Sequence, residues 1–509
     1  MRLRWLKCLS VAVLLLMTAC TQNPLEKMIP SDATGVVSID VPEILEQASL
    51  IDDGKIVLPK SLQQVIDDND TSPLCVLLSD LPQLGLDTGD KAYIFFTVKT
   101  FGRVILASLD DPDMARKTLA MRAGGDFSKV EGLDCMYVGD NLYAIDGKVL
   151  LVGTVNKAMD VSRAARAAKG VLAKTSTSIM DNKDVKDVLH NSDGEVNMWL
   201  QGKSLKTILG KSDVYRELVQ KMPLIGIFTE SDIDAVTCCV GLDKDGVDMD
   251  AHILAADGSE YAQLLNSTLG TPSGDVLRAI PNSMDYIFSM SVKGENFVQL
   301  KQIQQLLGMF SRLPYIGRID LAGILKTVDG PFTIGLARDP HLEGEWNMVL
   351  AARSTDPEGV VNKISAFANS MGQAPELYEG EYIYQYDNKM IRIGVVEGIL
   401  YVKMLDYEQT EGYAYEMQPV RDFFNSALIG FFAQTRNDDV TGYFDFGLQD
   451  IFNGKGHFYT SDSKANASLE LLRSLCSIKT HDAFGNEEGD DDSMSSLISG
   501  AIDKLQPME

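Results

Sequence analysis

The sequence has little positive charge for its length. Its 509 residues include 46 lysines and arginines against 72 aspartates and glutamates, which gives a formal net charge of −26. Proteins that bind nucleic acid need a basic surface to neutralise phosphates, so this composition argues against a nucleic-acid partner. Long apolar runs are also missing, because no stretch beyond the N-terminus reaches transmembrane length.

Common motifs of metal, cofactor and nucleophile sites are absent from the sequence as well. It has no CxxC pair, no GxSxG elbow, no P-loop and no dinucleotide fingerprint. No histidine belongs to an HxH, HxxxH or HExxH motif; the five are His190, His252, His341, His457 and His481. We therefore predict no cofactor and no metal site, and we favour a protein that is not an enzyme.

Cysteine is scarce, and the number of cysteines is odd. Beyond Cys8 and Cys20 the chain has five: Cys75, Cys135, Cys238, Cys239 and Cys476. An odd number cannot pair completely within one chain. We expect these residues to be small buried hydrophobic side chains, with a disulfide in an oxidising compartment as the alternative.

The N-terminus has the pattern of a cleaved export signal. Three basic residues precede the apolar run Val11–Leu16, which is too short to span a bilayer permanently. The segment Met17-Thr18-Ala19-Cys20 then resembles the lipobox of bacterial lipoproteins. This resemblance implies a signal peptide over residues 1–19 and a lipid on Cys20. An ordinary secretory signal with an unrelated cysteine is the alternative.

Residues 20–27 are the expected lipidated tether. Several acyl chains on one residue are enough to hold a protein on a membrane. Neither an aspartate nor an acidic run follows Cys20. By resemblance to known lipoproteins, this favours the periplasmic face of the outer membrane over display on the cell surface. The expected partners are the membrane, through the anchor, and an envelope protein.

One stretch near the expected mature N-terminus occurs twice. Ile29–Val41 and Ile280–Val292 both begin with Ile-Pro and continue into alternating apolar and polar residues, at an offset of 251 residues. Such alternation is typical of a half-buried strand. Two more features follow in the same order in both halves. Asp111-Pro112 and Asp356-Pro357 predict helix starts, and turns at Asp146-Gly147 and Glu397-Gly398 predict hairpins.

Further elements complete each half. In the first we predict helices at about 42–49, 59–68, 111–120 and 157–168, and strands at 92–98, 103–109, 142–145, 149–152, 236–242 and 247–254. In the second we predict helices from 295 to 309 and from 356, and strands at 287–292, 332–337, 346–353, 440–446 and 467–472.

The predicted fold is therefore α+β, with two homologous units of mainly antiparallel strands and packed helices behind a lipoprotein signal peptide. The predicted units span residues 28–270 and 276–480. We expect residues 481–509 to form an acidic tail with a short amphipathic helix, which would dock on its own domain or on a partner.

The lipobox, the Ile-Pro turn with its Val/Ile-Ser strand, and the duplicated unit resemble a family of uncharacterised Bacteroidota lipoproteins, domain of unknown function 4836. The resemblance covers most of the mature chain. It implies a location in a Gram-negative envelope and carries over no catalytic residue.

Three possible ligand sites have simpler structural interpretations. Asp243–Gly246 has calcium-loop residues but no closing glutamate, so we interpret it as a hairpin turn. We interpret the acidic tail, which could also bind calcium weakly, as a spacer. Tyr382, Tyr384 and Tyr386 would share a strand face, and we favour packing over a binding stripe. Trp199 and Trp346 lie in strand patterns, which favours the core.

We therefore favour a lipid-anchored envelope protein that binds a partner or scaffolds an assembly. The alternatives are an envelope hydrolase that acts on glycan or peptide, and a surface lipoprotein that captures glycans or ions.

The lipid anchor is directly testable. Cys20→Ser should release the protein from the membrane fraction, because the acylated side chain is lost. Fractionation of the variant that still requires detergent for release would contradict the lipobox interpretation.

Overall fold

The structure is a computed structural model of the chain. It describes residues 24–52, 55–68, 78–97, 101–155, 159–173, 177–192, 194–204, 232–311, 319–338, 346–370, 375–378, 380–386, 389–405, 412–437, 440–462 and 464–477. These residues form two compact units. The first takes in the chain up to Glu46, Ile51–Val57 and Asp80–Trp199, and the second takes in Gln47–Leu50, Leu58–Ser79 and the chain from Leu200.

The first unit is built on an antiparallel sheet of seven strands. They pair in the order β1 (Gly35–Ile39), β4 (Ala92–Phe96), β5 (Phe101–Ser108), β9 (Val149–Val155), β8 (Asn141–Asp146), β7 (Leu133–Val138) and β6 (Ser128–Val130). Short strands β2 (Ile51–Asp52) and β3 (Lys55–Ile56) form a separate hairpin. The division of the chain between the two units falls within β10 (Val196–Gln201), after Trp199.

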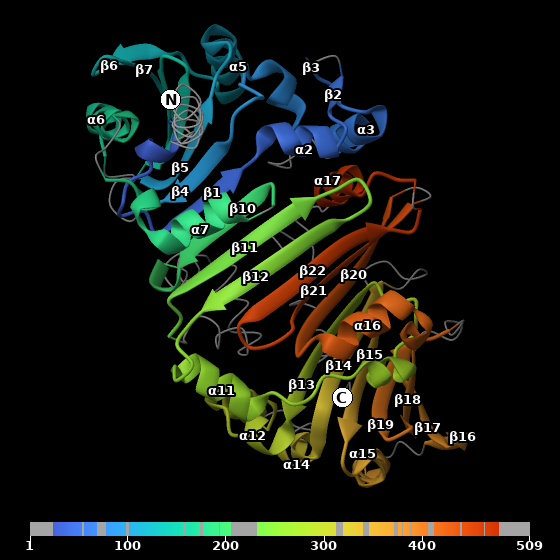
Figure 1. Ribbon diagram of the computed structural model, residues 1–509. Helices are drawn as coiled ribbons and strands as arrows, with labels where there is room; N and C mark the ends of the chain where they lie inside the picture. The colour runs from blue at the N-terminus through green and yellow to red at the C-terminus, as the bar shows by residue number, and fades with distance from the viewer. Residues whose placement is uncertain are drawn as a thin grey trace, which may run out of the picture. The chain divides into compact units, whose positions relative to one another are not determined.

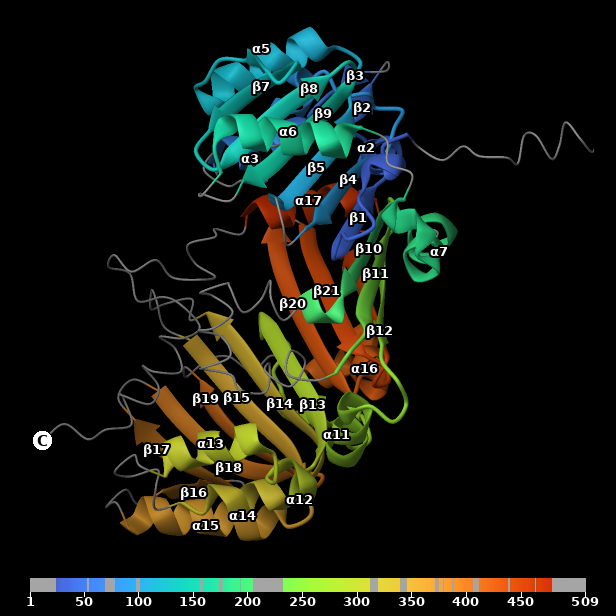
Figure 2. The same cartoon turned by 90° about the vertical axis from the view of Figure 1, so that its left-hand side faces the viewer.

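Helices of the first unit pack on this sheet. α5 (Pro112–Ala123) begins at Asp111, whose carboxylate accepts hydrogen bonds from two free amides of the first turn, as the Asp-Pro pair predicts. α6 (Val161–Leu172) packs on β7, β8 and β9 through buried alanines (Figure 2). The remaining helices are η1 (Glu26–Met28), α2 (Val41–Gln47), η2 (Leu81–Gln83), η3 (Ile179–Asp181) and α7 (Lys183–Asn191).

Strands of the second unit repeat the pairing order of the first. They are β13 (Tyr286–Lys293), β14 (Val328–Arg338), β15 (Trp346–Ser354), β19 (Ile399–Leu405), β18 (Lys389–Val396), β17 (Glu381–Tyr386) and β16 (Glu376–Tyr378) (Figure 1). From β13 the sheet continues on the other side through β20 (Ile429–Asn437), β21 (Val440–Leu448), β22 (Asn453–Thr460), β12 (Val247–Leu254) and β11 (Ala235–Leu242).

Both faces of this second sheet are covered. α15 (Pro357–Ser370) packs on one face of β17, β18 and β19 through Val360 and Val361. On the opposite face a core cluster joins η4 (Gly274–Ala279), η6 (Ala414–Glu416) and α16 (Gln418–Ser426) to β13, β15 and β19. The other helices are α3 (Lys60–Asp68), α11 (Glu260–Thr268), α12 (Gly294–Phe297), α13 (Lys301–Phe310), α14 (Leu321–Lys326) and α17 (Ala467–Ser477).

Smaller features recur in the same order in both units. The isolated bridge Pro30–Ser178 in the first unit corresponds to Pro281–Tyr413 in the second. Each bridge precedes a 3-10 turn and then a nine-residue helix, α7 or α16, at a constant offset of 235 residues. Mixed helices with a large antiparallel sheet confirm the predicted α+β class.

Several predictions of local structure need correction. The helix predicted from 295 to 309 is broken into α12 and α13, with Val298–Leu300 between them. Residues 467–472, predicted as a strand, begin α17 instead, because Asn466 accepts a hydrogen bond from the Leu469 amide and caps a helix. β22 was not predicted.

The compact units also divide the chain elsewhere than the predicted repeats do. β11, β12 and α11 precede residue 270, yet they pack with the second unit. Among the described residues, no helix is both long and apolar enough to cross a membrane.

Two glycines in the first unit allow a matched test of the turn geometry. Gly147 has a φ of +57° between β8 and β9, whereas Gly170 lies inside α6, and an added Cβ would meet nothing within 4 Å at either position. Gly147→Ala should lower the free energy of unfolding by about 1–2 kcal/mol, because alanine disfavours the left-handed region. Gly170→Ala should raise it by about 0.5–1 kcal/mol. Urea denaturation measures both, and equal effects of the two changes would contradict the assigned turn.

Candidate functional site

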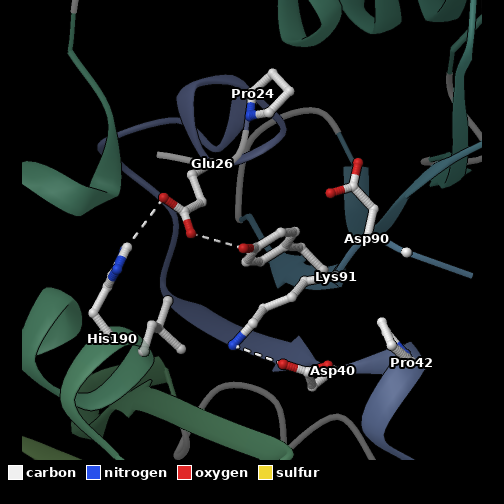
Figure 3. Close-up of a pocket in the computed structure, with 10 residues that line it drawn as sticks. Pro24, Glu26, Asp40, Pro42, Asp90, Lys91 and His190 are labelled. Atoms are coloured by element: carbon white, nitrogen blue, oxygen red, sulfur yellow. Dashed lines mark hydrogen bonds and ion pairs between the residues drawn. The ribbon is translucent and has the colours of Figure 1, made fainter. Parts of the chain in front are cut away.

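A pocket of about 510 Å³ lies in the first unit (Figure 3). Its polar lining comes from five places in the chain: η1, the end of β1, the turn before β4, β4 itself and α7. The polar side chains are Glu26, Asp40, Asp90, Lys91, Tyr93 and His190. Apolar walls are added by two prolines and a leucine.

Glu26 is the central group of this pocket. Only 4% of the residue is exposed, and its Oε1 accepts a hydrogen bond of 2.7 Å from the Tyr93 hydroxyl. His190 Nε2 lies 3.2 Å from Oε2. That contact has the distance of an ion pair but does not form a hydrogen bond, so Oε2 has no hydrogen-bond donor among the described residues. Figure 3 shows the carboxylate between the phenol and the imidazole.

The backbone of Glu26 is held from a distant part of the chain. The Ser178 hydroxyl donates to the Glu26 carbonyl at 2.6 Å. Ser178 is itself fixed as the cap of η3, in a reciprocal capping box with Asp181. Glu26 is therefore fixed through both its main chain and its side chain.

The opposite side of the pocket carries an ion pair. Lys91 Nζ lies 3.1 Å from Asp40 Oδ2, where β1 leads into α2. Beside it, Asp90 Oδ2 accepts a hydrogen bond of 2.7 Å from the Ser108 hydroxyl. The lysine charge is thus already matched by a carboxylate within the protein.

Tyr93 acts here as a hydrogen-bond donor. Burial raises the pKa of its phenol far above the ordinary 10.0, and the nearby Glu26 carboxylate raises it further. The hydroxyl therefore remains protonated in the folded protein and keeps donating to Glu26.

The second unit has no such site at the equivalent place. The offset of 251 residues puts Leu277 at the position of Glu26 and Ser291 at the position of Asp40. In the β13–β14 pairing, Thr333 takes the place of Tyr93. Asn425 of α16 matches His190 of α7, and it accepts a hydrogen bond from the Gly274 amide. Equivalent backbone thus carries apolar or neutral side chains.

A different charged cluster lies in the second unit, on β17, β18 and β19. Lys403 is 5% exposed, with its Nζ 4.3 Å from the centre of the Tyr401 ring and 5.1 Å from that of Tyr413. Burial lowers the pKa of Lys403. The Tyr401 hydroxyl donates to Glu381, which lies 3.5 Å from Arg392.

An aspartate–histidine pair lies on β21 and β22. Asp445, 4% exposed, receives a hydrogen bond from the His457 amide and lies 2.8 Å from His457 Nδ1. Burial raises the pKa of Asp445, and the hydrogen bonds from His457 oppose this shift. His457 Nε2 lies 3.9 Å from Asp248 on β12. Within the described ranges no group of three His, Cys, Asp or Glu side chains is placed to hold a metal ion.

The cysteines and the acidic segments singled out in the sequence are described only in part. Cys20, Cys75 and the acidic tail lie outside the described residues. Burial raises the pKa of Cys135 and Cys238 to about 11, which makes them poor nucleophiles. Asp243–Gly246 is a hairpin turn, as predicted.

Of the aromatic residues singled out in the sequence, Tyr384, Tyr382 and Trp199 pack as expected, whereas Trp346 does not lie in the core. Tyr384 belongs to the core cluster under α15, and Tyr382 packs against it. Trp199 is 6% exposed in β10, and Trp346 is half-buried in β15.

Comparisons with known proteins give little further information. No protein-family model matches the chain, and no curated protein matches it either. Crystal form III of TP0453 covers 48% of this chain and 84% of its own, at 11% identity and a TM-score of 0.30. The DNA polymerase III subunit beta from Pseudomonas aeruginosa covers 78% and 98%, at 10% identity and a TM-score of 0.10. Similarity this low supports no conclusion about function.

Sequence reasoning missed the Glu26 pocket because its residues are far apart in the chain. Glu26 is separated from Tyr93 by 67 positions, and no short motif connects them. One signal was available: the repeat places a leucine, Leu277, where the first copy has glutamate. A position that carries a charged residue in one copy of the repeat and an apolar residue in the other is a candidate for a functional site.

The Tyr93 hydrogen bond can be tested by removing a single oxygen. Tyr93→Phe should destabilise the first unit by about 1–3 kcal/mol, since Glu26 Oε1 would be left buried without its donor. Tyr143→Phe is the matched control, because Tyr143 is a half-buried residue of β8 in the same unit. This change should alter the free energy of unfolding by no more than about 0.5 kcal/mol. Hydrogen exchange of β1 and β4 peptides reports the change locally. Equal protection in both variants would mean that the hydrogen bond contributes nothing.

Proposed function

We propose that this chain is a lipid-anchored envelope protein that binds a small polar molecule in the Glu26 pocket without transforming it. The observation that carries the proposal is a buried carboxylate, Glu26, which lines the pocket and has an oxygen without a hydrogen-bond donor among the described residues.

The cost of burying Glu26 supports a functional role. Moving a carboxylate out of water costs several kcal/mol unless its partners compensate fully. The proposed duplication supports this role, because Leu277 lies at the equivalent place of the second unit and packs in the core. We infer that a ligand compensates part of the cost of burying this charge.

The proposed anchor would keep the pocket close to the membrane. Only three residues separate Cys20 from Pro24, which lines the pocket. Four consecutive Cα–Cα steps reach at most about 14 Å. A ligand in this pocket would therefore be bound near the membrane surface.

We further infer that the two units arose by duplication. In support, seven strands pair in the same order in both, and the Pro-containing bridges recur with the helices that follow them. The predicted repeats of residues 28–270 and 276–480 belong to this proposal, as does the resemblance to the Bacteroidota lipoprotein family.

A hydrolase is the second candidate, favoured by the Asp445–His457 pair. A carboxylate on Nδ1 fixes the imidazole and leaves Nε2 as a base, as in known catalytic dyads. We rank it second because His457 lies directly opposite both Asp445 and Asp248 in the strand register, so ordinary cross-strand pairing explains the cluster.

Native mass spectrometry of the lipidated chain, extracted from membranes in mild detergent, tests the binding function. A small molecule should be retained by the wild type and lost from Glu26→Gln, which keeps the size of the side chain but not its charge. Glu358→Gln, at an exposed position in the first turn of α15, is the matched control and should retain the molecule.

A different result would change the assignment. If the wild type retains no molecule while one envelope protein cross-links to the chain in stoichiometric amount in cells, a scaffolding role replaces binding.

A further inference from the structure

We propose that the ligand of the Glu26 pocket carries a primary ammonium group, either as a free amine or as the ethanolamine headgroup of a lipid. This inference rests on the proposed binding function and names the chemical class of the ligand.

The charge balance of the pocket favours a cation. Its lining has three carboxylates, Glu26, Asp40 and Asp90, beside the ammonium of Lys91 and the imidazole of His190. Lys91 is already paired with Asp40 at 3.1 Å. An anion entering the pocket would be repelled by the Glu26 carboxylate, whereas a cation would be attracted to it.

The hydrogen-bonding state of Glu26 calls for a donor. Tyr93 satisfies Oε1, but Oε2 is buried and receives no hydrogen bond from the described residues. His190 is within 3.2 Å of Oε2 without the alignment of a hydrogen bond. An N–H group of a ligand that reaches this buried oxygen would supply the missing bond, and a charged donor would make it roughly twice as strong as a neutral one.

Other cations fit less well. A divalent metal ion takes several oxygen or nitrogen ligands, and within the described residues no three such side chains converge. A quaternary ammonium has no N–H, so it would leave Oε2 unsatisfied. The apolar walls from Pro24, Pro42 and Leu189 can accommodate the carbon chain that an amine carries.

Isothermal titration calorimetry tests the class. The complete chain with Cys20→Ser, which removes only the anchor, is titrated with ethanolamine, choline and glycolate at equal ionic strength. Ethanolamine should bind at least about tenfold more tightly than choline or glycolate, the difference expected for one charge-assisted hydrogen bond. This series compares ligands on one protein and therefore does not depend on a pocket variant.

Variants then place the binding at Glu26. Glu26→Gln should weaken ethanolamine binding at least about tenfold, while Glu358→Gln should leave it unchanged. Equal binding of the three probes, or equal affinity of both variants for ethanolamine, would overturn the inference.

Vesicles distinguish the two sources of the amine. The Cys20→Ser chain is sedimented with vesicles of phosphatidylcholine alone or mixed with phosphatidylethanolamine. Binding that requires phosphatidylethanolamine and Glu26 indicates the lipid headgroup, and ethanolamine binding in solution without it indicates a free amine. If neither the vesicles nor ethanolamine bind, the inference fails. If native mass spectrometry still shows a retained molecule that has no amine, only the amine inference is wrong. If no molecule is retained, the binding function is wrong as well.

Discussion

Antiparallel pairing of β1 with β4, and of β13 with β14, is the constraint on which the rest depends. In the first unit the register sets Ser38 opposite Tyr93, and in the second it sets Ser289 opposite Thr333. A slip of one residue would turn every side chain to the other face of the sheet. In the second unit the pair is self-contained, because the two hydroxyls lie 2.8 Å apart and buried. In the first, the longer phenol reaches beyond the strand pair to Glu26. The pocket therefore results from a change of side chains within a fixed backbone pairing.

The two units bury charge in different places, and each is apolar where the other is charged. Glu26 corresponds to Leu277, and Lys403 of β19 corresponds to Gly153 of β9 in the strand pairing. The surroundings give the physical reason for the second difference. In the first unit a Cβ added at Gly153 would lie 2.7 Å from the Phe101 ring, so there is no room for a side chain. In the described part of the second unit no helix intervenes between β19 and η6, and Lys403 lies over tyrosine rings instead. The charge of Lys403 thus lies against aromatic rings, whereas the charge of Glu26 lies between the Tyr93 hydroxyl and the His190 imidazole.

Local signals in the sequence were sufficient for much of the fold. The Asp-Pro start of α5, the Asp-Gly turn between β8 and β9, and the alternation in β13 each depend on neighbouring residues, so each could be predicted. β22 was missed because Gly454 and Gly456 interrupt its pattern. At Gly456 an added Cβ would lie 2.8 Å from the Asp445 carbonyl oxygen, so the residue is required by a neighbouring strand. The pocket was also missed because it depends on contacts between distant parts of the chain. Its lining residues come from η1, β4 and α7.

The proposed duplication explains in physical terms how a destabilising site could arise in one unit. A buried carboxylate with an unsatisfied oxygen reduces a stability margin that is only about 5–15 kcal/mol for a typical domain. In the second unit the equivalent position strengthens the core, since Leu277 packs with Ile280 and Phe424. In the first unit the Ser178 and Tyr93 hydroxyls compensate part of the cost by fixing the main chain and one carboxylate oxygen. These two hydroxyls leave Glu26 Oε2 without a donor, and a ligand would supply one. Ligand binding would therefore stabilise the first unit.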